Sequence, residues 1–133
     1  MCLEKDVFDE CFNRLLPYIA YNEPHRHFIH GDCHPWNILS DGIIDGNCKY
    51  GDALIDIVTL DRYMKEFQVI DRYRAYLEAN EVLIPHFDER IIGAKLYMGL
   101  ESMRFYSKMG WNDAYAELRD EMLSLPVYRQ VSI

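Results

Sequence analysis

Residues that can do chemistry gather in one short segment of the chain. Residues 30–37 read HGDCHPWN, and Asp45 follows eight positions after Asn37. The amide of Asn37 and the carboxylate of Asp45 offer hard oxygen ligands, which Mg²⁺ takes together with phosphate oxygens. Asp32 stands on a loop near them, where it can accept a proton from an attacking hydroxyl. This set predicts phosphoryl transfer, in which the protein positions the reactants and a metal neutralises charge.

The elements that must position this segment are a helix before it and a hairpin within it. Apolar residues at helical spacing predict a helix over 4–21, and 27–30 reads as a short strand. Asp41-Gly42 is a strong two-residue turn signal, so 38–44 is predicted to form a tight hairpin with positions 38 and 45 roughly opposite. Asn37 and Asp45 would then lie at its two bases, where their side chains can converge.

After Gly51 the pattern is helical to the end of the chain. Helices are expected over 53–67, 69–80, 88–108 and 112–125, with Asp88 capping the third. No repeat, low-complexity stretch or linker interrupts them. The predicted fold class is therefore mainly α with a small β-hairpin.

Charge and composition narrow the classes of partner. The 133 residues carry 14 Lys+Arg against 22 Asp+Glu, a net charge of −8, which argues against a nucleic-acid partner. No apolar run approaches the roughly 20 residues that span a bilayer, so no membrane partner is expected. We also see no signal peptide, and Cys2, Cys11, Cys33 and Cys48 form no C-x-x-C pair, so a cytoplasmic protein with reduced thiols is expected.

Three elements, in this order, resemble the aminoglycoside phosphotransferase (APH) and choline kinase-like family. They are the HGDCHPWN loop, Ile44-Asp45, and Gly51-Asp52 through Asp56. The resemblance covers roughly 5–125, with the specific part at 28–57. It implies the C-terminal lobe of a protein kinase-like fold over 1–133, with the catalytic loop and metal segment at 28–57 and a helical subdomain at 58–126. It further implies an ATP-dependent small-molecule O-phosphotransferase, most like the kinases of aminoglycosides, macrolides and hygromycin that confer antibiotic resistance.

The resemblance also implies roles for single residues. Asp32 would be the catalytic base, while Asn37 and Asp45 would hold Mg²⁺ against the phosphates of ATP. The residues expected to support the loop are His30, His34, Asp52 and Asp56, with Trp36 and Ile38 packed beneath it. Asp52 or Asp56 would do so by hydrogen bonds from the start of the next helix.

Two departures from the family pattern bear on activity. The family normally holds ATP with an N-terminal lobe that has a glycine-rich loop and a lysine, whereas only 29 residues precede His30 and Lys5 is their only lysine. We therefore expect the N-terminal lobe to be missing, so that the chain is truncated and inactive alone, or works with a partner or a longer parent chain. The Asn37 to Asp45 stretch is also shorter than usual, and Gly46 replaces the usual tryptophan after Asp45.

Other readings of the same residues remain open. The chain could be a non-catalytic acidic module that binds a hydroxylated, cationic small molecule, since several late helices carry acids, among them Glu101 and Glu117.

A zinc site is another alternative, with His30, Cys33 and His34 as ligands. The spacing of the two histidines would need a helix, which Gly31 and Pro35 oppose. The aromatic residues of the late helices (Tyr97, Phe105, Tyr106 and Trp111) read as helix packing, with an aromatic cage as the alternative.

Overall fold

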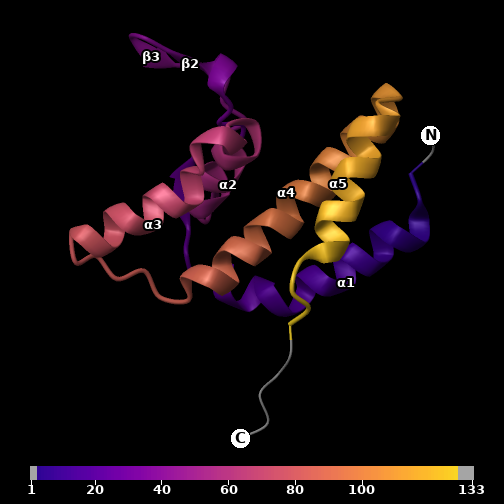
Figure 1. Ribbon diagram of the computed structural model, residues 1–133, viewed down its shortest axis with the longest axis horizontal. Helices are drawn as coiled ribbons and strands as arrows, with labels where there is room; N and C mark the ends of the chain where they lie inside the picture. The colour runs from indigo at the N-terminus through magenta and orange to yellow at the C-terminus, as the bar shows by residue number, and fades with distance from the viewer. Residues whose placement is uncertain (1–2, 129–133) are drawn as a thin grey trace, which may run out of the picture.

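The computed structural model describes residues 3–128 and is mostly helical, as the sequence predicts (Figure 1). Its elements are α1 (Lys5–Asn22), β1 (His27–Ile29), the 3-10 turn η1 (Pro35–Asn37), β2 (Ile38–Leu39), β3 (Gly42–Ile43), β4 (Lys49–Gly51), α2 (Leu54–Tyr63), the 3-10 turn η2 (Lys65–Phe67), α3 (Val69–Ala79), α4 (Phe87–Met109) and α5 (Asn112–Ser124).

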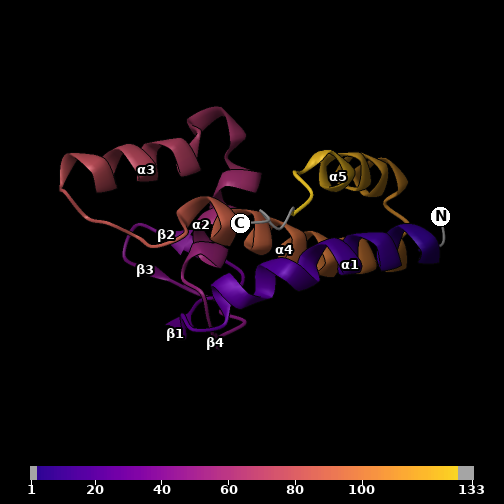
Figure 2. The same ribbon diagram turned by 90° about the horizontal axis from the view of Figure 1, so that it is seen from below.

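Helix α4 lies at the centre of the fold and packs against α1, α2 and α5 (Figures 1 and 2). Two core clusters meet on it. The first joins α1, α4 and α5 through fully buried side chains such as Cys11, Leu96 and Leu118. The second joins α2, α3 and α4 through Leu54, Val58 and their neighbours. Because both clusters use α4, the helices before and after segment 28–57 share one support.

The strands form two small antiparallel sheets. β1 pairs with β4, with His27 opposite Gly51, and so ties the start of the segment that carries Asp32 and Asp45 to its end. β4 lies in a stretch for which the sequence predicted no strand. β2 and β3 form the predicted hairpin, which projects from the helices at the upper left of Figure 1.

The register of this hairpin differs from the prediction. Ile38 lies opposite Ile43 and Leu39 opposite Gly42, so the turn is Ser40-Asp41 and not Asp41-Gly42. Neither Asp41 nor Gly42 takes the positive φ that the predicted turn requires. The partner of Ile38 is thus residue 43 rather than 45, a shift of two, which keeps the side chains on the faces they were expected to occupy.

Two predicted helix ends are also wrong. The helix expected over 53–67 ends at Tyr63, and 65–67 form a 3-10 turn before Gln68, whose φ of 49° breaks the helical path. α4 begins at Phe87, because the carbonyl of His86 already accepts the N–H of Arg90, so His86 and not Asp88 is the N-cap.

None of the helices described over residues 3–128 combines the length and the apolar character that a membrane span needs.

Candidate active site

The loop that carries Asp32 is fixed by a carboxylate from the first turn of α2. The two oxygens of Asp56 accept the backbone N–H groups of His30 and Gly31, each at 2.9 Å. Gly31 has φ of +82°, and a Cβ there would lie 2.1 Å from the carbonyl oxygen of Asn47. Both the backbone angle and the close approach therefore require glycine before Asp32.

His30 connects this loop to the segment that carries Asp45. Its Nδ1 accepts the backbone N–H of Asp32 at 3.2 Å, and its Nε2 lies 2.7 Å from the carbonyl oxygen of Ile44. Because Nδ1 is the acceptor, the ring proton must sit on Nε2 and be donated to Ile44. His30 thus sets the distance between the loop and the residue next to Asp45.

Asp32 and Asn37 lie in direct contact. The amide nitrogen of buried Asn37 donates to the backbone oxygen of Asp32 at 3.0 Å and lies 3.5 Å from Oδ2 of the same residue. The side chain of Asp32 remains 49% exposed, so a substrate can reach it. Since Asn37 donates through nitrogen, its amide oxygen is the atom left for a metal.

His34 lies beside the same carboxylate. Its Nε2 is 3.6 Å from Oδ2 of Asp32, and its ring makes edge contacts with Trp36 and Tyr63. Its Nδ1 is buried and has no hydrogen-bond partner among the described residues. The expectation that Trp36 and Ile38 pack beneath the loop is wrong: they are 74% and 41% exposed, because the chain leaves the body there to enter the hairpin.

Asp45 follows directly after a residue whose backbone is bonded to Asn37, but the structure shows no hydrogen bond between the side chains of Asp45 and Asn37. The N–H of Ile44 donates to the carbonyl of Asn37 at 2.9 Å, and exposed Asp45 follows with φ of 52°. Aspartate tolerates this left-handed conformation better than most residues. An amide oxygen and one carboxylate suit Mg²⁺, which takes few protein ligands alongside phosphate oxygens, so the donor set fits that ion.

The zinc alternative does not fit. Within residues 3–128, no group of three or more His, Cys, Asp or Glu side chains could hold a metal ion. Both ring nitrogens of His30 are engaged, and burial raises the pKa of the Cys33 thiol, which disfavours the thiolate that zinc needs.

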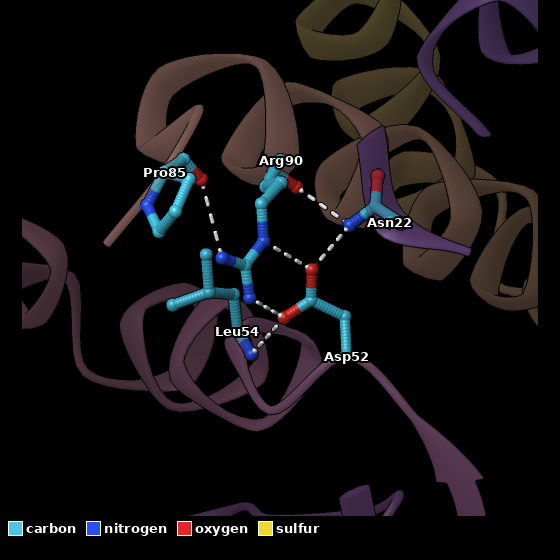
Figure 3. A network of polar contacts seen from close by, with 5 residues as sticks. All are labelled: Asn22, Asp52, Leu54, Pro85 and Arg90. Atoms are coloured by element: carbon cyan, nitrogen blue, oxygen red, sulfur yellow. Dashed lines mark hydrogen bonds and ion pairs between the residues drawn. The ribbon is translucent and has the colours of Figure 1, made fainter. Parts of the chain in front are cut away.

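Asp52 lies in a different contact network from Asp56 (Figure 3). Its buried carboxylate makes two bonds of 2.8 Å with Arg90 of α4, and it also accepts from the side chain of Asn22 and the N–H of Leu54. Burial alone raises the pKa of Asp52, but these donors outweigh it and keep the pKa below its ordinary value. Of the two candidates, Asp56 lies against the catalytic loop, and Asp52 ties β4 to α1 and α4.

A cleft of about 430 Å³ opens in front of Asp32, between α2 and α4. Tyr63 lines it from α2, and Glu101, Ser102 and Phe105 line it from α4. Burial, followed by the hydroxyl of Tyr106 and the carboxylate of Asp32, raises the pKa of Tyr63, so it is a neutral phenol at pH 7.

One wall of the cleft is supported by a basic side chain from β4. Nζ of Lys49 donates to the hydroxyl of Tyr97 at 3.0 Å and lies 3.8 Å from Oε2 of Glu101. The Tyr97 hydroxyl donates in turn to Oε1 of Glu101 at 3.1 Å. Burial lowers the pKa of Lys49, but Tyr97 and Glu101 outweigh it and raise the pKa, so the cation persists.

Sequence reasoning missed Tyr63, Lys49 and Arg90. Each of them contacts residues far away in the sequence, and only the packing of α2 and β4 on α4 brings those residues together. The only sequence signal for Arg90 was its place in the first turn of a predicted helix. A buried acid such as Asp52 needs a cation beside it, and Arg90 could have been considered for that role.

Comparison with known proteins settles the family. The sequence model of the phosphotransferase enzyme family (APH) matches residues 2–105. The chain belongs to this family. The match includes segment 28–57 and most of α4. No curated protein and no solved structure matches the chain.

Proposed function

We propose that the chain is the catalytic, C-terminal lobe of an ATP-dependent small-molecule O-phosphotransferase with a protein kinase-like fold. One observation carries this proposal. Asp32 and Asn37 are joined by hydrogen bonds on a loop whose backbone Asp56 fixes, and Asp32 faces an open cleft. An acid that is both positioned and accessible is the arrangement that a general base needs.

The proposed step moves one proton and one phosphoryl group. An acceptor alcohol lies in the cleft with its hydroxyl against Asp32, which takes the hydroxyl proton. The alcohol oxygen bonds to the γ-phosphorus of ATP while the bond from that phosphorus to the β–γ bridging oxygen breaks, and ADP leaves. Asn37 lies 3.5 Å and His34 3.6 Å from Oδ2 of Asp32, where they would orient the carboxylate, and His30 accepts the backbone N–H of Asp32.

Mg²⁺, when bound, would neutralise the phosphate charge. The oxygen atoms of Asn37 and Asp45 would hold it. The contact of His30 with the Ile44 carbonyl and the backbone bond from Ile44 to Asn37 hold the segment of Asp45 against the loop. Asn37 and Asp45 are therefore positioned by the same set of contacts.

The nucleotide clamp is proposed to come from residues other than 3–128. In the described part of the chain, the segment before β1 is the single helix α1, and no glycine-rich loop precedes Asp32. A preceding segment of a longer chain or a separate chain would supply it. The described lobe alone is then expected to bind Mg·ATP weakly and to turn over slowly or not at all, because one reactant is poorly positioned.

The proposed acceptor is a hydroxylated, cationic small molecule, of the kind that antibiotic kinases take. Asp32 and Glu101 both line the cleft and give it two carboxylates. Arg104, which also lines the cleft, and Lys49, 3.8 Å from Glu101, offset part of this charge.

Manganese can test the metal site without turnover. In the 133-residue chain, Mn²⁺ with ATP is expected to broaden the amide resonances around Asn37 and Asp45. Asn37→Ala and Asp45→Ala should each reduce this broadening about tenfold or more. Asp41→Ala, which removes an exposed carboxylate from the hairpin turn, should leave it unchanged. Broadening that survives both site variants would reject the assignment.

Turnover provides a second test. Labelled phosphate from ATP should reach a panel of amino alcohols and aminoglycosides faster with the chain and its nucleotide-binding lobe than with the chain alone. Asp32→Ala should abolish transfer, a loss of about 10²–10⁴-fold for a general base. Transfer by Asp32→Ala at the original rate would show that another group accepts the proton.

A non-catalytic binding module is the second candidate, favoured by the acids of the cleft. Calorimetry with kanamycin separates the two. A module would bind kanamycin with an affinity indifferent to Asp45→Ala and to Mg·ATP. A phosphotransferase lobe would show coupling between kanamycin and Mg·ATP that Asp45→Ala removes.

A further inference from the structure

Two hollows lie on neighbouring faces of α4 and share lining residues. The catalytic cleft is on the flank toward α2, and a groove of about 220 Å³ lies on the flank toward α1. Glu101 and Arg104 line both, so only this part of α4 separates them. We call the second hollow the α1–α4 groove; its other lining residues are Phe8, Phe12, Leu15, Tyr97 and Leu100.

The α1–α4 groove is apolar except where it meets the cleft. Leu15 and Leu100 are buried and form its floor, and Phe12 is 45% exposed. The hydroxyl of Tyr97 is already bound by Lys49 and Glu101. A molecule that crosses Glu101 and Arg104 therefore passes from a polar cleft to a hydrocarbon surface.

We propose that the α1–α4 groove is a second subsite for the acceptor and binds an apolar arm of the alcohol whose hydroxyl faces Asp32; this rests on the proposed function. The acceptor class is then an amphiphilic alcohol, polar at one end and aliphatic at the other. An apolar arm gains free energy by leaving water for Phe12, Leu15 and Leu100.

The size and position of the groove favour this occupant over a protein partner. A stable protein interface takes roughly 20–30 residues on each side, whereas seven residues line the groove. The groove also adjoins the cleft through Glu101 and Arg104, so one small molecule can contact both.

Alkyl glucosides test this proposal on the chain as it is. Titrations followed by amide NMR would compare n-octyl β-D-glucoside, below its micelle concentration, with methyl β-D-glucoside. The octyl compound is expected to bind about tenfold more tightly, because only its chain reaches the groove, and to shift resonances of α1 and α4 around Phe12 and Leu100.

Two matched variants on α1 locate the effect. Phe12→Ser should reduce the advantage of the octyl compound to about twofold or less. Leu16→Ser should leave it intact, because Leu16 is equally exposed at 46% but does not line the groove.

Several results would overturn the subsite. They are equal affinity for the two glucosides, no binding of the octyl compound, an advantage that survives Phe12→Ser, or shifts confined to the exposed hairpin. Octyl binding at the groove in a chain that fails the manganese test would instead reject the phosphotransferase and leave the groove as a binding site.

Discussion

At the scale of single residues, the site depends on carboxylates that have different tasks. Asp32 is accessible, Asp56 accepts two backbone N–H groups of the loop, and Asp52 is buried against Arg90. An aspartate that accepts two N–H bonds is fixed in place and gives its partners a fixed position in return. The difference between these residues lies in their partners and not in their side chains.

Asp56 should control the order of the catalytic loop. Asp56→Ala removes both acceptors of the His30 and Gly31 N–H groups, and should lower the free energy of unfolding by about 2–4 kcal/mol. Asp56→Asn keeps one acceptor oxygen and should cost less. Urea denaturation measures the total, and hydrogen exchange at residues 30 and 31 localises it. Unchanged protection of those two amides in Asp56→Ala would show that the loop does not depend on this contact.

Asp52 should make stability depend on pH. Its folded pKa lies below the ordinary 3.8, so its contribution is full above that value and is lost as pH falls through the lowered folded pKa. Asp52→Asn leaves Arg90 without its charge partner and should cost about 3–5 kcal/mol at neutral pH. Urea denaturation from about pH 6 to 2 should show the gap between the two proteins shrinking as pH falls. A constant gap would mean that folding leaves the pKa of the Asp52 carboxyl unchanged.

At the scale of elements, the sequence predicted the helices better than the hairpin. Apolar spacing located α1, α3, α4 and α5 to within two residues, because each buries one face. The Asp41-Gly42 signal placed the hairpin turn wrongly, since the bond from Ile44 to Asn37 sets the register. In this hairpin, the turn preference of Asp41-Gly42 is weaker than the backbone hydrogen bonds that pair the two strands next to buried Asn37.

The same limit applies to the candidate site. The order of the motif indicated Asp32, Asn37 and Asp45, and it indicated that an acid at the start of α2 would bind the loop. It did not decide between Asp52 and Asp56, because both lie near that helix start. Packing decides: Arg90 of α4 reaches Asp52, and no sequence spacing encodes that contact.

The crossing of α1 and α4 should require a glycine at position 93. A Cβ on Gly93 would lie 2.3 Å from Oδ1 of Asn22, whose amide nitrogen is bound to Asp52 and to the Arg90 carbonyl. Asn22 cannot move without losing those bonds, so Gly93→Ala should destabilise by about 1–3 kcal/mol despite the better helix propensity of alanine.

Gly99 in the same helix is the matched control. A Cβ there would meet Sδ of Met122 at 2.2 Å, the far end of a flexible side chain that can shift. Gly99→Ala should therefore cost less than Gly93→Ala in urea denaturation. Equal costs at the two positions would remove the special role of Asn22.

At the scale of the whole molecule, α4 should make the two core clusters unfold together. Leu118 of the first cluster is 1% exposed, and Val58 of the second is 2% exposed, with α4 between them. Leu118→Ala should lower global stability by about 2–5 kcal/mol. If the clusters form one cooperative unit, the slowest-exchanging amides of α2 should lose as much protection as those of α5, measured by native-state hydrogen exchange. The reciprocal variant, Val58→Ala, should likewise reduce protection in α5. Loss confined to α5 in the first variant and to α2 in the second would show two independent units, and the catalytic loop would then depend on α2 and its neighbours alone.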